Sequence, residues 1–170
     1  MDGQMRTLTG FGTFASIFTV LAASTATFGT GMAAATGPVP ISSTLRNCDG
    51  SAVKTAVQAP RTSLGRGVVL VHPSGSTVSA DIDLVISNQA GMHYDVGLIQ
   101  VPRPTSATCG PGDPGTTYAG VDTDPAGHAA ITITAPIQQG TTGVWVMVTT
   151  PNPHNQAPAE YYSSEFVAPV

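Results

Sequence analysis

The chain has 170 residues, a formal net charge of −4 and only 9% charged residues, together with 19 glycines and 14 prolines. Ordinary soluble domains carry roughly 25% charged residues, so hydroxyl groups and backbone must wet much of this surface. Six lysines and arginines in the whole chain argue against a nucleic-acid partner and an anionic membrane surface, because phosphate binding depends on clustered cations. The 41% apolar content is the opposite of the disorder signature.

The N-terminal segment has the pattern of a secretory signal peptide. No charged side chain lies between Arg6 and Arg46, and the stretch FGTFASIFTVLAASTATF is apolar with small and hydroxyl residues interspersed. A basic residue, an apolar stretch and the Ala-x-Ala site at Ala33–Ala35 predict export, with a signal peptide over 1–35. The alternative is a retained anchor, which the interruptions disfavour because a membrane span needs about 20 predominantly apolar residues. The protein is therefore expected to be secreted or associated with the cell envelope.

The remaining segment, 36–170, is the size of one domain. It shows no sustained 3.6-residue period; short runs of alternating apolar and polar residues are separated by Gly, Pro, Asn and Asp, which is typical of strands joined by turns. We expect strands over 67–71, 77–87, 92–101, 116–121, 128–134, 143–150 and 160–170, a further strand within 41–47, and either a strand or a helical turn over 51–58. Seven or eight short strands predict a single antiparallel β-sandwich.

Two cysteines, Cys48 and Cys109, belong to this segment. In an oxidising compartment an even pair is interpreted first as a disulfide. The bridge would close a loop of about 62 residues, which the chain-entropy description values at about 4 kcal/mol. The alternatives are two free thiols or half of a metal site, but neither cysteine has a partner at CxxC or CxxH spacing.

Two of the expected strands, 77–87 and 92–101, carry the acidic residues Asp81, Asp83 and Asp95. If they form a hairpin with their apolar faces together, Asp83 lies opposite Asp95. Like charges directly opposite each other destabilise a strand pair, so a compensating group is expected. The outward face of this hairpin would carry Asp81, Asp83, His93 and Asp95.

Two interpretations of this acidic face remain open. A calcium ion could be held by Asp81, Asp83 and Asp95, since calcium takes carboxylate oxygens; it is the one cofactor the sequence suggests. Alternatively the face is an ordinary solvated one, with His93 pointing to water and Tyr94 pointing to the core. The solvated face is the simpler interpretation, because carboxylates on exposed strands are common.

No motif supports a catalytic centre. The chain has no G-x-S-x-G elbow, and its four histidines show neither HxH nor HExxH spacing. A Ser–His–Asp triad assembled by the fold remains an alternative, because a triad is recognised by geometry rather than by chain order. The sequence therefore favours a non-enzymatic protein and leaves a secreted hydrolase of envelope polymers as the alternative.

Aromatic residues near the C-terminus offer one indication of binding. Tyr161 and Tyr162 are adjacent in an expected strand, so they point to opposite faces, and Trp145 could share the side of one of them. A surface aromatic can stack on a sugar or anchor a protein partner. The alternative places one tyrosine in the core and the other with its hydroxyl in water.

The sharpest turn signal lies in VDTDPAGHAAITIT, where Asp124, Pro125 and Gly127 fit positions i, i+1 and i+3 of a type I turn. The run TDPAGHAAITIT followed by GTTGVWVMV resembles the TDxxG–strand–G–strand pattern of bacterial immunoglobulin-like sandwich domains, over about 115–150. The closing order of an apolar strand, a proline loop and PAEYYS is also similar to CHRD-type sandwich domains. The resemblances imply an immunoglobulin-like sandwich fold and secretion; neither supplies a catalytic residue.

These observations predict an exported, disulfide-braced, immunoglobulin-like β-sandwich that acts as a binding or structural module of the envelope or extracellular space. Its partner would be a protein or a glycan, not nucleic acid, and not a membrane once the signal peptide is removed.

Overall fold

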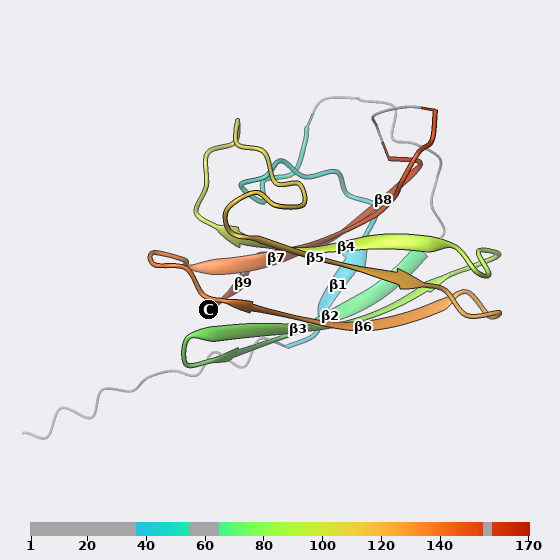
Figure 1. Cartoon of the computed structure of the whole chain (residues 1–170), viewed down its shortest axis with the longest axis horizontal. Coiled ribbons are helices and arrows are strands. Elements are labelled where there is room, and N and C mark those ends of the chain that lie inside the picture. The colour runs from blue at the N-terminus through green and yellow to red at the C-terminus, as the bar shows by residue number, and fades with distance from the viewer. Residues whose placement is uncertain (1–36, 55–64, 155–157) are drawn as a thin grey trace, which may run out of the picture. The chain divides into compact units, whose positions relative to one another are not determined.

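The computed structural model describes residues 37–54, 65–154 and 158–170 (Figure 1). The predicted signal peptide over 1–35 and the second half of the 51–58 segment lie outside these residues. The first half of that segment contributes only an isolated bridge between Arg46 and Ala52. No helix that could cross a membrane is found among the described residues.

The described fold is all-β, and the seven principal strands predicted from the sequence are confirmed. The early strand lies at the start of the predicted region, and the last predicted strand is divided into two. The strands are β1 (Val39–Ser42), β2 (Gly65–Ser74), β3 (Thr77–Ile86), β4 (His93–Val101), β5 (Thr116–Asp122), β6 (His128–Pro136), β7 (Gly143–Thr150), β8 (Glu160–Ser164) and β9 (Ala168–Pro169).

The strands form one continuous antiparallel sheet in the order β5-β4-β7-β8-β1-β2-β3-β6, and β9 pairs with β7. The two strands at the ends of this order, β5 and β6, contact each other, so the sheet is a nearly closed barrel. The predicted all-β, antiparallel architecture is thereby confirmed, with a single hydrogen-bonded sheet in place of two separate layers.

The hairpin predicted between the two aspartate-bearing strands, β3 and β4, is wrong. β3 pairs with β2 and β6, whereas β4 pairs with β5 and β7. Asp83 consequently lies opposite Val68 on β2, and Asp95 lies opposite Gly120 on β5. The like-charge pair that the sequence argument required does not form.

The reason is a tighter turn on the other side of β3. Only Gly75 and Ser76 separate β2 from β3, and Ser74 pairs directly with Thr77. Gly75 has a φ of 60°, a conformation that glycine adopts without steric cost and that two-residue hairpin turns require. β2 therefore runs to Ser74 and occupies one edge of β3.

The turn between β5 and β6 is the one predicted from the sequence. The Gly127 amide donates to the Asp124 carbonyl at 2.9 Å, which closes the turn. The Asp124 carboxylate accepts from the amides of Ala126 and His128 at 2.8 and 2.9 Å. These hydrogen bonds, the His128 amide first, lower the pKa of Asp124.

The barrel interior is built from the inward side chains of alternating strands. On β3 these positions are all buried: Val78, Ala80, Ile82, Leu84 and Ile86. β7 is apolar on both faces, as its sequence predicts for a central strand: Val146 lies in the barrel core and Trp145 in a second cluster on the outer side. The sheet therefore buries apolar side chains on its outer surface as well as inside.

The second cluster lies beneath two loops joined by the predicted disulfide, which is confirmed. Cys48 and Cys109 are bonded, with their Cα atoms 5.6 Å apart. Ile99, Val101 and Trp145 are buried in this cluster, with Cys109 packed against them. We call the outer side of β4 and β7 under these loops, which Figure 1 shows on one side of the sheet, the covered half.

Candidate functional site

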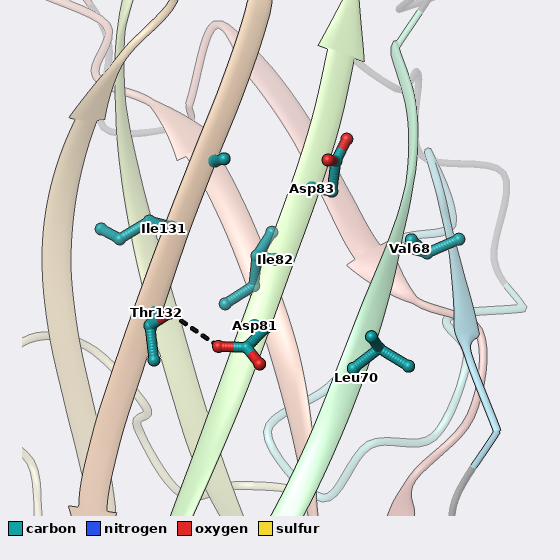
Figure 2. A pocket seen from close by; sticks show the side chains of 8 residues that line it. Val68, Leu70, Asp81, Ile82, Asp83, Ile131 and Thr132 are labelled. Atoms are coloured by element: carbon teal, nitrogen blue, oxygen red, sulfur yellow. Dashed lines mark hydrogen bonds between the residues drawn. The ribbon is translucent and has the colours of Figure 1, made fainter.

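The outward side chains of β2, β3 and β6 are the counterpart of the covered half. All are exposed or half-exposed, and they surround a shallow depression of about 370 Å³ (Figure 2). Two inward residues, Ile82 and Ile131, form its floor. We call this surface the open face and define it by six side chains: Val68, Leu70, Asp81, Asp83, Ala130 and Thr132.

Strand register places these six side chains in two rows across the sheet. Val68, Asp83 and Ala130 are directly opposite one another, and so are Leu70, Asp81 and Thr132. Each row therefore sets an apolar group on β2 beside a carboxylate on β3, as Figure 2 shows. Val68 is 39% and Leu70 36% exposed, so apolar surface and negative charge are presented to solvent together.

Histidines flank both carboxylates. His72 Nε2 lies 3.1 Å from Asp81 Oδ2, and His128 Nε2 lies 3.2 Å from Asp83 Oδ1. Thr132 Oγ1 donates to Asp81 Oδ1 at 2.6 Å. Within the part of the chain that the structure describes, Asp83 Oδ2 has no hydrogen-bond partner, so it is free to accept from a ligand.

The other predicted polar residues lie on β4, away from the open face. His93 points to solvent, as expected, and its Nδ1 lies 2.6 Å from Asp122 Oδ1, while Nε2 lies 3.6 Å from Asp95 Oδ1. The Asp122 hydrogen bond raises the pKa of His93. Tyr94, next to it, is fully buried in the core, so the stretch MHYDV is a strand with one wet face.

The calcium site predicted from Asp81, Asp83 and Asp95 assumed a hairpin that does not form. The first two carboxylates are on β3 and the third is on β4, and these strands are not neighbours in the sheet. Among the described residues, no group of three or more His, Cys, Asp or Glu side chains is arranged to hold a metal ion.

The predicted aromatic binding residues are buried. Tyr162 is 0%, Trp145 1% and Tyr161 7% exposed, so the expectation that one ring is available at the surface is wrong. The two tyrosines do point to opposite faces: Tyr162 packs in the barrel core, whereas the Tyr161 hydroxyl accepts from the Arg46 amide at 3.3 Å. Loops distant in sequence cover the outer rings, and a strand pattern carries no signal for that.

A further polar cluster gave no sequence signal at all. Glu160 Oε2 accepts from the hydroxyls of Tyr94 and Tyr162 at 2.8 and 3.0 Å, and Gln89 donates to Oε1 at 3.2 Å. Burial first, and then the Glu160 carboxylate, raises the pKa of Tyr94. The cluster ties β4 to β8 and gives the hydroxyls of the buried Tyr94 and Tyr162 a shared carboxylate acceptor.

Three histidines lie beside carboxylates, and such a pair supplies two of the three members of a hydrolytic triad. Among the described residues, however, no serine hydroxyl is hydrogen-bonded to a histidine. The nucleophile, which the histidine of a triad activates, is therefore not placed beside His72, His93 or His128 in the part of the chain that the structure describes.

Fold and surface together define a class: an all-β, disulfide-braced antiparallel barrel with one outer side covered by loops and another left open. Compared with protein-family models, curated proteins and solved structures, the chain matches none of them. Any assignment of function therefore depends on the geometry of the chain's own residues.

Proposed function

We propose that this protein is a non-enzymatic binding module of the extracellular space or cell envelope, and that the open face is its binding surface. One observation carries the proposal: the same sheet buries the outward apolar side chains of its covered half but exposes those of the open face. The disulfide is compatible with an extracellular location.

The covered half and the open face differ in the free energy gained by burying their outward apolar side chains. Ile99 is fully buried on the outside of β4, whereas Val68, Leu70 and Val85 keep 39%, 36% and 41% of their surface exposed on β2 and β3. Burying an aliphatic side chain stabilises by about 1.5–3 kcal/mol relative to leaving it exposed. A cluster of such side chains around a depression is the kind of surface on which a partner gains that free energy.

The fold supports a module of this kind. We propose that the barrel is related to the immunoglobulin-like sandwich domains that 115–150 resembles, since the antiparallel strands and the Asp124 turn both agree with that pattern. Rigid strands hold the side chains of the open face at fixed spacing, which favours recognition of a partner without a change of fold.

The test is a binding map by NMR on the isotope-labelled secreted protein. Probes of distinct chemistry are titrated separately: a basic, an acidic and an apolar peptide, and a neutral oligosaccharide. We expect at least one probe to shift the amides of β2, β3 and β6 while the covered half stays unchanged. Shifts confined to other surfaces, or none with any probe, would overturn the proposal.

A matched pair of variants separates specific binding from nonspecific hydrophobic association. Val68→Ser with Leu70→Ser removes the apolar part of the open face. Phe166→Ser is the control, because Phe166 is 62% exposed and is not among the residues of the open face. Binding should fall only in the first variant, and equal loss in both would contradict the assignment of the surface.

A further inference from the structure

We infer that the open face takes an extended peptide segment of a partner protein that carries lysine or arginine at alternate positions. The inference rests on the proposed function, since it names the occupant of the surface proposed there. It follows from the spacing of the two carboxylates, the apolar side chains beside them and the balance of charge around them.

The spacing comes first. Asp81 and Asp83 are two residues apart on β3 and point to the same side. With a rise of about 3.4 Å per residue, same-side positions of a strand are about 7 Å apart. An extended partner segment has the same repeat, so cations at its positions i and i+2 can meet both carboxylates at once. Adjacent cations would point to opposite sides of the segment.

The apolar side chains select long basic residues over small cations. Val68 and Leu70 lie beside the carboxylates on β2, and Ala130 lies on the other side of Asp83. Lysine and arginine have aliphatic stems that cover apolar surface while their charged ends reach a polar group. The free Asp83 Oδ2 can accept from such an end, and Asp81 has further acceptor capacity beside its two contacts.

Charge favours a basic partner over an acidic one. On the outward sides of β2, β3 and β6 the carboxylates are Asp81 and Asp83, and Arg66 is the one side chain with a permanent positive charge. Asp124, in the turn before β6, adds a third carboxylate 4.0 Å from His128. The whole chain carries a net charge of −4.

A second copy of this chain is a poorer occupant. Nowhere in its 170 residues are two lysines or arginines two positions apart. Arg46 and Arg103, moreover, donate to backbone carbonyls of the protein itself. The occupant is therefore expected on a different protein.

The experiment uses two peptides of one composition: acetyl-Thr-Ser-Lys-Thr-Lys-Ser-Thr-amide, with alternate lysines, and acetyl-Thr-Ser-Lys-Lys-Thr-Ser-Thr-amide, with adjacent lysines. A third peptide replaces the alternate lysines with glutamates. Each is titrated into the labelled protein at low salt and pH 8. We expect the alternate peptide to shift open-face amides and to bind at least threefold more tightly than the adjacent one.

Variants test the assigned groups. Asp81→Asn with Asp83→Asn keeps the side-chain shape and should weaken the alternate peptide about tenfold at pH 8. His72→Asn with His128→Asn is the matched control at the neighbouring side chains and should leave binding at pH 8 within about twofold. Thermal unfolding checks that each variant stays folded, and a variant that unfolds is replaced by the corresponding single substitution.

The outcomes separate the two proposals. If another probe shifts the open face and the alternate peptide does not, or if both lysine peptides bind equally, this inference fails while the proposed function stands. If open-face signals broaden with protein concentration alone, the occupant is a second copy and the inference fails. If no probe shifts the open face, both proposals fail.

Discussion

The covered half and the open face are built from the same kind of strand but differ in whether their outward apolar side chains are buried. β4 and β7 bury Ile99 and Trp145 on their outer side, whereas β2 exposes Val68 and Leu70 on its own. The difference lies in the loops: those carrying Cys48 and Cys109 supply the cover, and one disulfide holds them together. An apolar outward position is thus a core residue or a surface residue according to which loop reaches it.

Polar contacts reinforce the cover where it exists. The Trp145 indole donates to the Cys48 carbonyl at 3.4 Å, and the Tyr118 hydroxyl donates to the Cys109 carbonyl at 2.5 Å. Burial raises the pKa of Tyr118, as expected for a phenol enclosed by the loop. On the open face the carboxylates of Asp81 and Asp83 contact side chains of the same sheet, namely His72, Thr132 and His128, rather than loop carbonyls.

Removing the disulfide should have the largest effect on the difference between the covered half and the open face. Cys48→Ala with Cys109→Ala should lower the free energy of unfolding by about 4 kcal/mol, from the entropy of a loop closed over a sequence separation of 61 residues. Trp145 fluorescence should shift to the red as the cover loosens. Chemical denaturation measures the loss; a change below about 1 kcal/mol would show that packing alone holds the loops.

A matched pair of truncations compares the stability contributed by an apolar side chain on each surface. Ile99→Ala, on the covered half, should cost about 2–4 kcal/mol because it leaves a cavity among buried groups. Leu70→Ala, on the open face, should change stability by no more than about 0.5 kcal/mol. Both follow from denaturant midpoints at unchanged slope, and similar losses at the two positions would mean that Leu70 is covered in solution.

The next effect is a pH dependence carried by His93. Its pKa is raised in the folded protein, chiefly by Asp122, above an unfolded value of about 6.5. The contribution to stability is therefore fully present below about pH 6.5 and is lost as pH rises through the folded pKa. NMR titration of the imidazole measures this, with Asp122→Asn as the matched variant: its His93 should titrate at a lower pH than in the parent protein.

Individual strands could be predicted from the sequence because alternation is a local signal. In β3 every second side chain is buried, as the pattern TVSADIDLVIS indicates. Pairing is not local, and there the prediction failed. The turn at Gly75–Ser76 is a hairpin signal, since it places two residues containing glycine between strands, but the predicted strand over 67–71 stops short of it whereas β2 runs to Ser74.

The candidate site was predicted in part. The alternation correctly predicts Asp81 and Asp83 as outward carboxylates, but their apolar neighbours Val68 and Leu70 belong to a strand whose run of valines gives no indication of which side faces out. Tyr161 shows the converse: the sequence predicts its strand correctly, yet the covering loops come from distant parts of the chain. Burial of an outward residue depends on tertiary contacts that alternation does not encode.

The smallest expected effect concerns calcium, and it tests whether the open face is a surface for a partner or a site for an ion. Asp81 and Asp83 are each held by a histidine on a neighbouring strand, and Asp95 is on a strand that does not adjoin theirs. Calcium takes 6–8 oxygen ligands, and among the described residues no group of three or more His, Cys, Asp or Glu side chains is arranged to hold a metal ion. Millimolar calcium should therefore leave the melting temperature within about 1 °C of the value in magnesium at equal ionic strength. A larger rise that Asp83→Asn abolishes would show that the carboxylates rearrange around an ion, and the open face would then be a metal site rather than a peptide surface.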